Sequence, residues 1–288
     1  MSGSSADRAD AAFCADLVRT HDFPRYASTL FLGADVRRAL LALYAFNAEI
    51  SRVRDSVTQP IAGEVRMQWW TDMLTGKGHG GVEGNPVASE LLLVIRSFGL
   101  SVEPLLRLIE EHQFDLYNDP MPTLAALEGY ATETSSALFG LAARIAGPPS
   151  PAADHLARHA GLAQGFAHVI ASLPRDASHR QLFVPLQLLR VQGSDMEEVF
   201  AGKQTPRLRA ALDKLIGEAQ GHLRTAFSLL AEGSQRIRPV FLPMVLVRRD
   251  LERMSRADTD PFAPPLPSRF STLWTLWRAS RSKAFADR

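Results

Sequence analysis

The sequence predicts an all-α protein that forms a single domain. Apolar residues recur at steps of three and four along most of the chain, and no segment keeps the period-two alternation of a half-buried strand. Helix starts are also marked, because a capping side chain repeatedly precedes a proline, whose missing N–H costs nothing at the first helical position. Three such starts are Asn85-Pro86, Ser150-Pro151 and Thr205-Pro206.

The periodicity predicts helices along the whole chain. In order they cover residues 6–19, 24–31, 34–56, 60–75, 86–98, 101–118, 123–146, 151–173, 186–200, 205–231, 236–257 and 267–284. The helix over 34–56 is apolar on most sides, which favours burial on more than one side. The helix over 86–98 lies between the capping residue Asn85 and Gly99, a residue type that commonly ends helices.

The helices of the second half have equally clear signals. Gly147 ends the helix over 123–146, and Pro174 breaks the helix over 151–173 near its end. The helix over 205–231 carries one apolar stripe at steps of three and four. Its members are Leu208, Leu212, Leu215, Ala219, Leu223, Ala226 and Leu230. The spacing is that of a long amphipathic helix with one face in the core.

Two segments interrupt the helical pattern. Residues 75–85 contain a formal G-x-G-x-x-G at Gly76, Gly78 and Gly81, but the segment follows a helix rather than a strand, so we expect a loop and no nucleotide site. Residues 258–268 form a proline-rich connector to a last amphipathic helix within 267–288. We therefore expect one domain over residues 1–288 that ends in this helix.

Composition excludes several classes of protein. The chain has 288 residues, with 32 Lys+Arg against 31 Asp+Glu, and a net charge of +1 lacks the basic surplus of a nucleic-acid binder. The single cysteine, Cys14, excludes an internal disulfide framework and indicates a reducing compartment. The N-terminus shows no signal peptide, and no apolar stretch reaches about 18 residues. We expect a cytoplasmic protein.

One face of the helix over 34–56 carries polar residues. Arg37, Tyr44, Ser51 and Asp55 follow one another at spacings of 7, 7 and 4 and therefore lie on one side of the helix. Because the rest of the helix is apolar, these groups need a polar cavity or each other. The alternative is an ordinary solvated stripe.

A second polar series crosses the helix over 151–173. His168, Ser172 and Asp176 lie at i, i+4 and i+8, although a histidine in an apolar stretch is more often a hydrogen-bonded core residue than a ligand. His155 and His159 are also four residues apart and could bind a transition metal. No third ligand completes a known spacing, so a solvated face is the alternative.

At these two helices the sequence resembles the squalene/phytoene synthase family. The matching words, in the family's order, are Arg37, Leu43-Tyr-Ala-Phe46, Gln68-Trp69-Trp70, Phe114-Asp115-Leu116, Tyr130-Ala-Thr-Glu-Thr-Ser135 and Arg175-Asp-Ala-Ser-His-Arg-Gln-Leu-Phe-Val-Pro185. The resemblance extends from about Tyr26 to Arg253 and implies an isoprenoid synthase-type helical bundle with a central cavity. It also implies a set of substrate-binding candidates, which are Tyr26, Arg37, Tyr44, Asp115, Gln164 and His168.

In that family two D-x-x-x-D motifs hold Mg²⁺, which binds and ionises a prenyl diphosphate. The corresponding segments here are Ser51-Arg-Val-Arg-Asp55 and Ser172-Leu-Pro-Arg-Asp176. Asp55 and Asp176 are the candidate metal ligands, whereas Ser51 and Ser172 stand where the family has aspartate. Loss of two carboxylates weakens the attraction for Mg²⁺. His168, Ser172 and Asp176 do have the spacing of the Asn/Ser/Glu metal triad of related terpene cyclases, in which serine binds Mg²⁺, but histidine is a poor match for asparagine there.

This pattern of loss resembles the non-catalytic branch that includes NADH dehydrogenase (complex I) assembly factor 6. The branch implies a binding or assembly role, with a prenyl diphosphate or lipid in the cavity and a respiratory-complex subunit as partner. The alternative is an active, Mg²⁺-dependent prenyl transferase acting on farnesyl or geranylgeranyl diphosphate. The short N-terminus, without an Arg-rich targeting helix, favours a bacterial protein over a mitochondrial precursor.

The last helix offers a second kind of contact. Phe270, Trp274 and Trp277 lie on one side of it, with basic residues nearby. Aromatic anchors beside basic residues suit a peripheral contact with the inner membrane or a partner groove. The alternative is that these aromatic side chains close the helical bundle.

Overall fold

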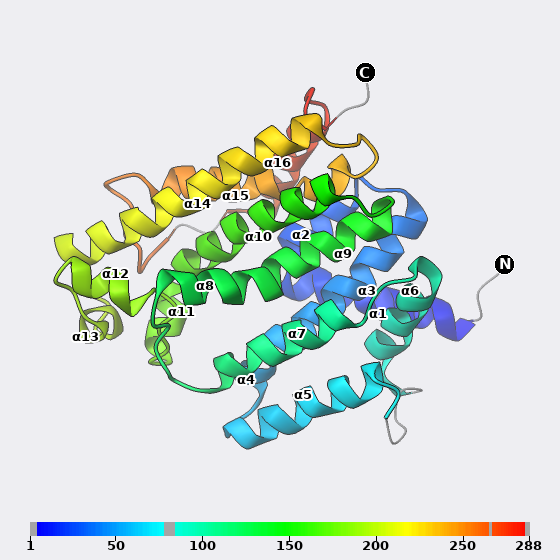
Figure 1. Cartoon of the computed structure of the whole chain (residues 1–288), viewed down its shortest axis with the longest axis horizontal. Coiled ribbons are helices and arrows are strands. Elements are labelled where there is room, and N and C mark those ends of the chain that lie inside the picture. Colours follow the sequence, from blue (N-terminus) through cyan, green and yellow to red (C-terminus); the bar gives the residue numbers. More distant parts are fainter. Residues whose placement is uncertain (1–4, 78–83, 265–266, 286–288) are drawn as a thin grey trace.

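All regular elements in the residues that the structure describes, 5–77, 84–264 and 267–285, are helices (Figure 1). The structure is a computed structural model. Its α-helices are α1 (Ser5–His21), α2 (Phe23–Thr29), α3 (Ala34–Ser51), α4 (Val53–Ser56), α5 (Pro60–Leu74), α6 (Pro86–Phe98), α7 (Glu103–Glu111), α8 (Leu124–Ala131), α9 (Ala137–Ala146), α10 (Pro151–Ala171), α11 (Leu173–Ser178), α12 (Leu186–Val191), α13 (Met196–Phe200), α14 (Pro206–Glu232), α15 (Met244–Met254) and α16 (Arg269–Ser280). Short segments with a different helical pitch join some of them. η2 (His112–Leu116) and η4 (Arg238–Phe241) are 3-10 helices, and η3 (Thr132–Ser136) is a π-helix. The all-α prediction is confirmed.

The predicted helix starts are formed by their capping side chains. The Asn85 side chain accepts hydrogen bonds from the backbone N–H groups of Val87 and Ala88. Ser150 and Thr205 cap α10 and α14 in the same way. α6 ends where the sequence indicated, because Gly99 adopts a left-handed conformation with φ of 60°.

Several predicted helices are interrupted. The helix expected over 34–56 breaks at Arg52, and the helix expected over 186–200 ends at Val191, shortly before Gly193, whose φ is 71°. In the 123–146 segment the threonine hydroxyls of η3 donate to backbone carbonyls one turn earlier, and the helix widens there. The predictions of single continuous helices in these three places were wrong.

The ends of other elements also differ from the prediction. The 101–118 segment tightens into η2 after Glu111, and the 236–257 segment begins with η4 around Pro239. The last helix stops at Ser280 rather than at 284. The predicted glycine-rich loop over 75–85 includes residues 78–83, and the predicted proline-rich connector over 258–268 includes residues 265–266. Both of these shorter ranges lie outside the described residues.

The helices pack in two groups, one around α10 and one around α3. α10 packs between α14 and α9, while α3 lies against α1, α6 and α9 (Figure 1). α10 also approaches η3 closely, because a Cβ built at Gly161 would lie 2.2 Å from the Cα of Ser136. Glycine at this position therefore sets the distance between two elements that form one wall of the cavity described below.

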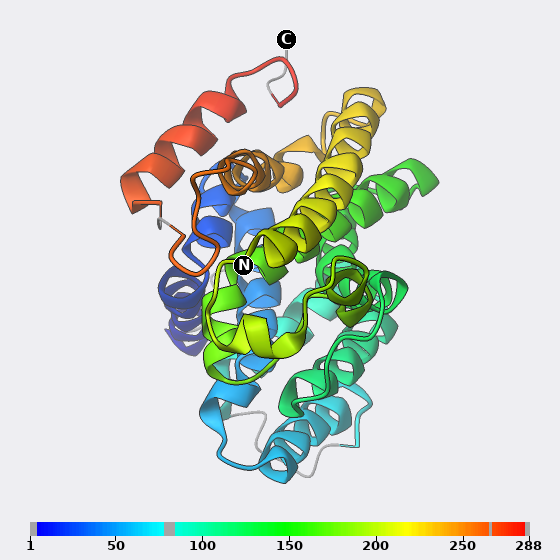
Figure 2. The same ribbon diagram turned by 90° about the vertical axis from the view of Figure 1, so that its left-hand side faces the viewer.

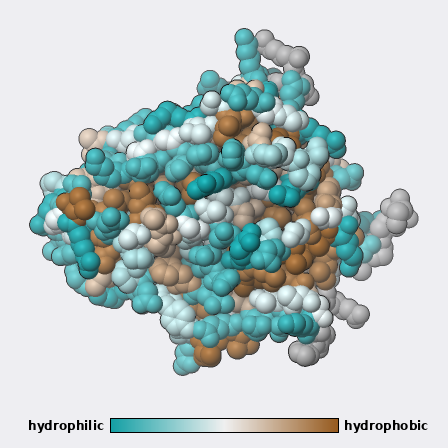
Figure 3. All heavy atoms as spheres, viewed as in Figure 1, coloured by the Kyte–Doolittle hydropathy of each residue, from teal (hydrophilic) through white to brown (hydrophobic). Residues whose placement is uncertain are grey.

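The periphery differs from this core. α16 lies at the edge of the bundle against α2 and α15 (Figure 2). On the face shown in Figure 3, apolar side chains reach the surface over α5, where Ile61 and Val65 are 61% and 65% exposed. Within the described residues no helix has both the length and the apolar character needed to span a bilayer.

Candidate functional site

A cavity of about 500 Å³ lies in the middle of the bundle. Its walls come from α1, α2, α3, α4, η2, α8, η3, α9, α10, α11 and α15, and Asp22, between α1 and α2, also lines it. One part of the wall is apolar, with Leu127, Ala131 and Leu138, whereas another part carries charged side chains. The volume falls in the range of about 300–1,000 Å³ that is usual for small-molecule sites.

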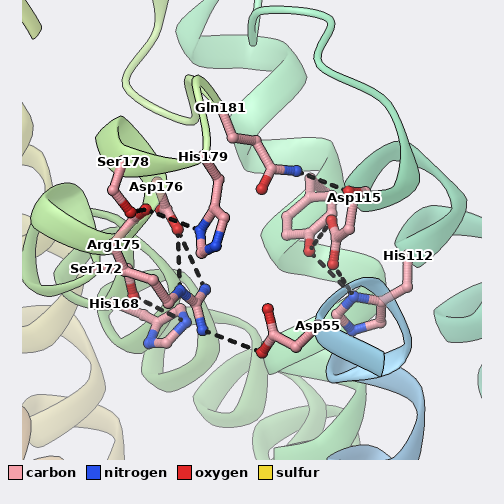
Figure 4. A network of polar contacts seen from close by, with 11 residues as sticks. Asp55, His112, Asp115, His168, Ser172, Arg175, Asp176, Ser178, His179 and Gln181 are labelled. Atoms are coloured by element: carbon pink, nitrogen blue, oxygen red, sulfur yellow. Dashed lines mark hydrogen bonds and ion pairs between the residues drawn. The ribbon is translucent and has the colours of Figure 1, made fainter. Parts of the chain in front are cut away.

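Arg175 lies between the two aspartates of the predicted metal motifs. Its guanidinium donates from Nε and Nη2 to Oδ1 of Asp176, at 3.2 Å each, and its Nη1 lies 4.0 Å from Oδ2 of Asp55 (Figure 4). Asp55 comes from α4, while Arg175 and Asp176 come from α11, so this contact joins segments more than a hundred residues apart. An internal cation therefore occupies the space between the two retained carboxylates.

Burial shifts the pKa of two side chains on this wall. Desolvation raises the pKa of Asp176 from 3.8 to about 6, and the neighbouring Arg175 offsets part of that rise. Desolvation also lowers the pKa of His168 to about 4, with Arg175 and Arg25 adding to the effect. The His168 ring lines the cavity, and with this lowered pKa its neutral form prevails at pH 7. Its Nε2 lies 3.3 Å from the Ser172 hydroxyl, and the tautomer decides which of the two groups donates the hydrogen bond.

Asp115 is held in a separate polar cluster on the opposite side of the cavity. Its Oδ2 lies 2.6 Å from Nδ1 of His112, and its Oδ1 accepts a 2.8 Å hydrogen bond from the Tyr130 hydroxyl. Gln181 donates to the backbone carbonyl of Asp115. Burial and the Asp115 carboxylate raise the pKa of Tyr130 well above its usual value, so this hydroxyl stays protonated and keeps donating.

A third polar group joins α2 to α10. Nη2 of Arg25 donates to Oε1 of Gln164 at 3.1 Å, and Nη1 of the same guanidinium pairs with Asp22 at 2.6 Å. The guanidinium also lies 5.5 Å from the ring centre of Tyr44. Tyr44 therefore supports a cavity residue from behind, and its burial raises its pKa to about 12.

The structure brings together most but not all of the predicted site residues. The cavity is lined by Ser51, Asp55, Asp115, Gln164, His168 and Asp176. It is not lined by Tyr26, Arg37, Tyr44 or Ser172. The single polar face predicted for the helix over 34–56 was wrong, because Tyr44 is buried among core residues and the helix breaks at Arg52 before Asp55.

The polar lining residues that sequence reasoning missed include Arg25, His112, Tyr130 and Arg175. Tyr130 and Arg175 lie in words quoted for the family resemblance, so that signal was present but assigned to no role. Arg25 and His112 lie outside those words, although each has a partner three residues away, Asp22 and Asp115 respectively. The contact of Arg25 with Gln164 depends on the tertiary fold.

The donor set around Asp55 and Asp176 does not fit an Mg²⁺ cluster. Among the described residues no three His, Cys, Asp or Glu side chains are placed to hold a metal ion. The residues four positions before and after Asp176 are Ser172 and Arg180, and neither is a carboxylate. A hard dication prefers several anionic oxygen ligands. The neutral Ser172, the basic Arg180 and the bridging Arg175 guanidinium therefore disfavour binding of Mg²⁺ here.

The two histidines of α10 have different surroundings. His159 faces α14, where its Nδ1 lies 2.9 Å from Nδ1 of His222, whereas His155 is exposed. Burial lowers the pKa of both paired histidines. A solvated face, the alternative to a metal site, thus describes His155 but was wrong for His159.

The chain is similar to proteins of known name and structure. The family model for squalene/phytoene synthase matches residues 18–278. NADH dehydrogenase (ubiquinone) complex I, assembly factor 6, of Rattus norvegicus is 31% identical over 261 residues, which are 91% of this chain and 78% of that protein. Presqualene diphosphate synthase of Sinorhizobium fredii is 25% identical over 214 residues, 71% of this chain and 75% of that protein.

Solved structures share the fold at lower identity. The squalene synthase HpnC of Alicyclobacillus acidocaldarius superposes with a TM-score of 0.76 at 20% identity, over 91% of this chain and 98% of that chain. This likeness confirms the predicted isoprenoid synthase-type bundle. Together with the match over residues 18–278, it leads to one conclusion: this chain belongs to the squalene/phytoene synthase family.

Proposed function

We propose that this protein is a non-catalytic member of the family, which binds an isoprenoid or another lipid in its cavity and acts in the assembly of a respiratory complex. The similarity to complex I assembly factor 6 supports the assembly role. The apolar and charged parts of the cavity wall support a ligand with a hydrocarbon chain and a polar head. The partner would be a subunit of that complex, met in the cytoplasm or at the inner face of the membrane.

The observation that carries the proposal is the contact of Arg175 with both Asp55 and Asp176. Ionisation of a prenyl diphosphate needs several positive charges around the leaving group, and family members gather them as Mg²⁺ on four carboxylates. Here only two of the expected carboxylates are present, and both already face the Arg175 guanidinium. The single charge of Arg175 can orient a polar head, but it supplies far less leaving-group stabilisation than a cluster of dications.

A binding experiment tests the cavity function. Titration of the purified protein with farnesyl diphosphate, by calorimetry in EDTA and then in Mg²⁺, should give dissociation constants that agree within about twofold. Asp55→Asn and Asp176→Asn should leave that agreement intact, whereas a larger side chain at Ala131, on the apolar wall, should abolish binding; circular dichroism establishes whether this variant is folded, because Ala131 is buried. Val191→Leu, at a 73% exposed position away from the cavity, is the control.

The competing function is an active Mg²⁺-dependent prenyl transferase. Retention of Asp55 and Asp176 favours it. It would require Arg175 to release both carboxylates when metal and diphosphate enter, and affinity would then rise at least tenfold with Mg²⁺ and fall in either Asn variant. That result would overturn the non-catalytic proposal.

A further inference from the structure

The exposed face of α16 is apolar, aromatic and unpartnered. Phe270, Trp274 and Trp277 occur at i, i+4 and i+7 and are 76%, 50% and 39% exposed. The opposite face holds the helix to the bundle, since Leu276 and Thr272 are almost fully buried against α2 and α15. The aromatic side chains therefore do not close the bundle, which was the alternative considered from the sequence.

The three aromatic residues are arranged as one surface. The Trp274 and Trp277 rings stack with centres 4.9 Å apart, and the Arg281 guanidinium lies 4.3 Å from the Trp277 ring centre. Stacking and the cation–π contact restrict the side chains before any partner arrives, which lowers the entropy lost on binding. A preformed aromatic surface of this kind is costly to leave in water, so it favours an apolar partner.

The charged residues along the α16 segment have one sign. Arg269, Arg278, Arg281 and Lys283 lie within fifteen residues of one another, and no Asp or Glu occurs between positions 261 and 286. Within residues 5–77, 84–264 and 267–285, none of these four cations forms an ion pair. The whole chain has a net charge of only +1, so the positive charge is concentrated beside the exposed aromatic residues.

From these observations we propose that α16 docks the protein on an anionic lipid bilayer. Tryptophan and phenylalanine side chains enter the boundary between headgroups and acyl chains, while arginine and lysine meet the lipid phosphates. The helix lies in the plane of the membrane, with Leu276 kept in the protein. A protein groove would also accept aromatic anchors, but four cations that form no ion pair within the described residues, with no acid between them in the sequence, match a uniformly anionic surface better.

The position of α16 gives this docking a consequence for the cavity. α16 packs on α2 and α15, and both of these helices contribute cavity wall, through Pro24 and Arg25 and through Leu246 and Met254. Docking through α16 therefore holds two walls of the cavity near the lipid phase. Membrane docking depends on the exposed face of α16 and not on whether the protein is catalytic.

Vesicle binding tests the proposal. The full-length protein is mixed with vesicles of phosphatidylcholine alone or with about 30% phosphatidylglycerol, and bound protein is measured by co-flotation. We expect binding to the anionic vesicles only, weakened by salt, together with a blue shift of tryptophan emission. That shift reports α16, because Trp70 is buried and Trp69 is partly buried.

Two variants and one control separate the contributions. R278Q/R281Q/K283Q removes three cations and should weaken binding roughly a hundredfold. F270S/W274S should abolish the binding and the blue shift. I61S/V65S, on the exposed apolar part of α5, is the matched control and should bind like the unmodified protein. Circular dichroism establishes that each variant is folded, as their exposed positions predict.

Three results would overturn the proposal. Absence of binding to anionic vesicles would leave the face to a protein partner, and equal binding to neutral vesicles would remove the role of the cations. Equal loss of binding in the α5 control would show that the association is not specific to α16.

Discussion

Asp176→Asn should stabilise the folded protein at pH 7. Burial raises the pKa of Asp176 from 3.8 to about 6, a shift of about two pKa units. Each unit corresponds to about 1.4 kcal/mol, so the ionised carboxylate costs the folded state as much as about 3 kcal/mol above pH 6. Its side chain is only 6% exposed, so solvent screening removes little of this cost. Asparagine keeps the shape and an acceptor for Arg175 without the charge.

The gain should depend on pH in a defined direction. Below pH 4 Asp176 is protonated in both the folded and the unfolded chain, and the variant should differ little from the unmodified protein. Between about pH 4 and 6 the unfolded chain releases the proton first, so stability of the unmodified protein falls relative to the variant. His168 contributes the opposite slope, because its pKa is lowered from 6.5 to about 4 and its stabilisation is gained as pH rises through that range.

Because these slopes oppose each other, the informative quantity is the difference between the two proteins. Urea denaturation at pH 4 and pH 7 gives the free energy of unfolding of each protein. Asp55→Asn is the matched control, since Asp55 faces the same guanidinium but is 40% exposed, and its stability change should stay small. A loss of stability in Asp176→Asn at pH 7, or an equal change at both pH values, would refute the reasoning.

Two further substitutions test how the cavity wall is built. Gly161→Ala should destabilise the protein by about 2–3 kcal/mol, because the new Cβ would lie 2.2 Å from the backbone of Ser136. Thermal melts measure this loss. In the same melts Gly140→Ala, with open space around it, should be neutral or slightly stabilising. Tyr130→Phe should cost about 1–3 kcal/mol in chemical denaturation, because the buried Asp115 carboxylate loses a 2.8 Å hydrogen bond. Tyr26→Phe is the control, because the Tyr26 hydroxyl forms no hydrogen bond within the described ranges, and it should cost less. Equal losses in the two variants would argue against the contact of Tyr130 with Asp115.

Local signals in the sequence were sufficient for the helices. Capping by Asn85, Ser150 and Thr205 depends on residues within three positions, and the structure shows each cap as expected. The breaks were less visible. Nothing in the local pattern marks Arg52 as a helix end. The wider turn at η3 does have a local correlate, because the Thr132 and Thr134 hydroxyls donate to backbone carbonyls four residues earlier.

The candidate site was partly predictable for a related reason. Asp55 and Asp176 were found because the family motifs are local in sequence. The contact of Arg25 with Gln164 and that of His159 with His222 join residues 139 and 63 positions apart, and no periodicity relates such partners. Tyr44 shows the converse case, in which a residue of the expected type lies behind the cavity rather than in its wall.

The most direct test of the non-catalytic proposal is release of diphosphate. Purified protein is incubated with farnesyl or geranylgeranyl diphosphate and Mg²⁺, and both free diphosphate and condensed hydrocarbon product are measured over many hours. With Arg175 joined to Asp55 and Asp176, we predict no product above the rate without protein. Turnover at about 1 s⁻¹ or faster, abolished by Asp176→Asn, would contradict the account.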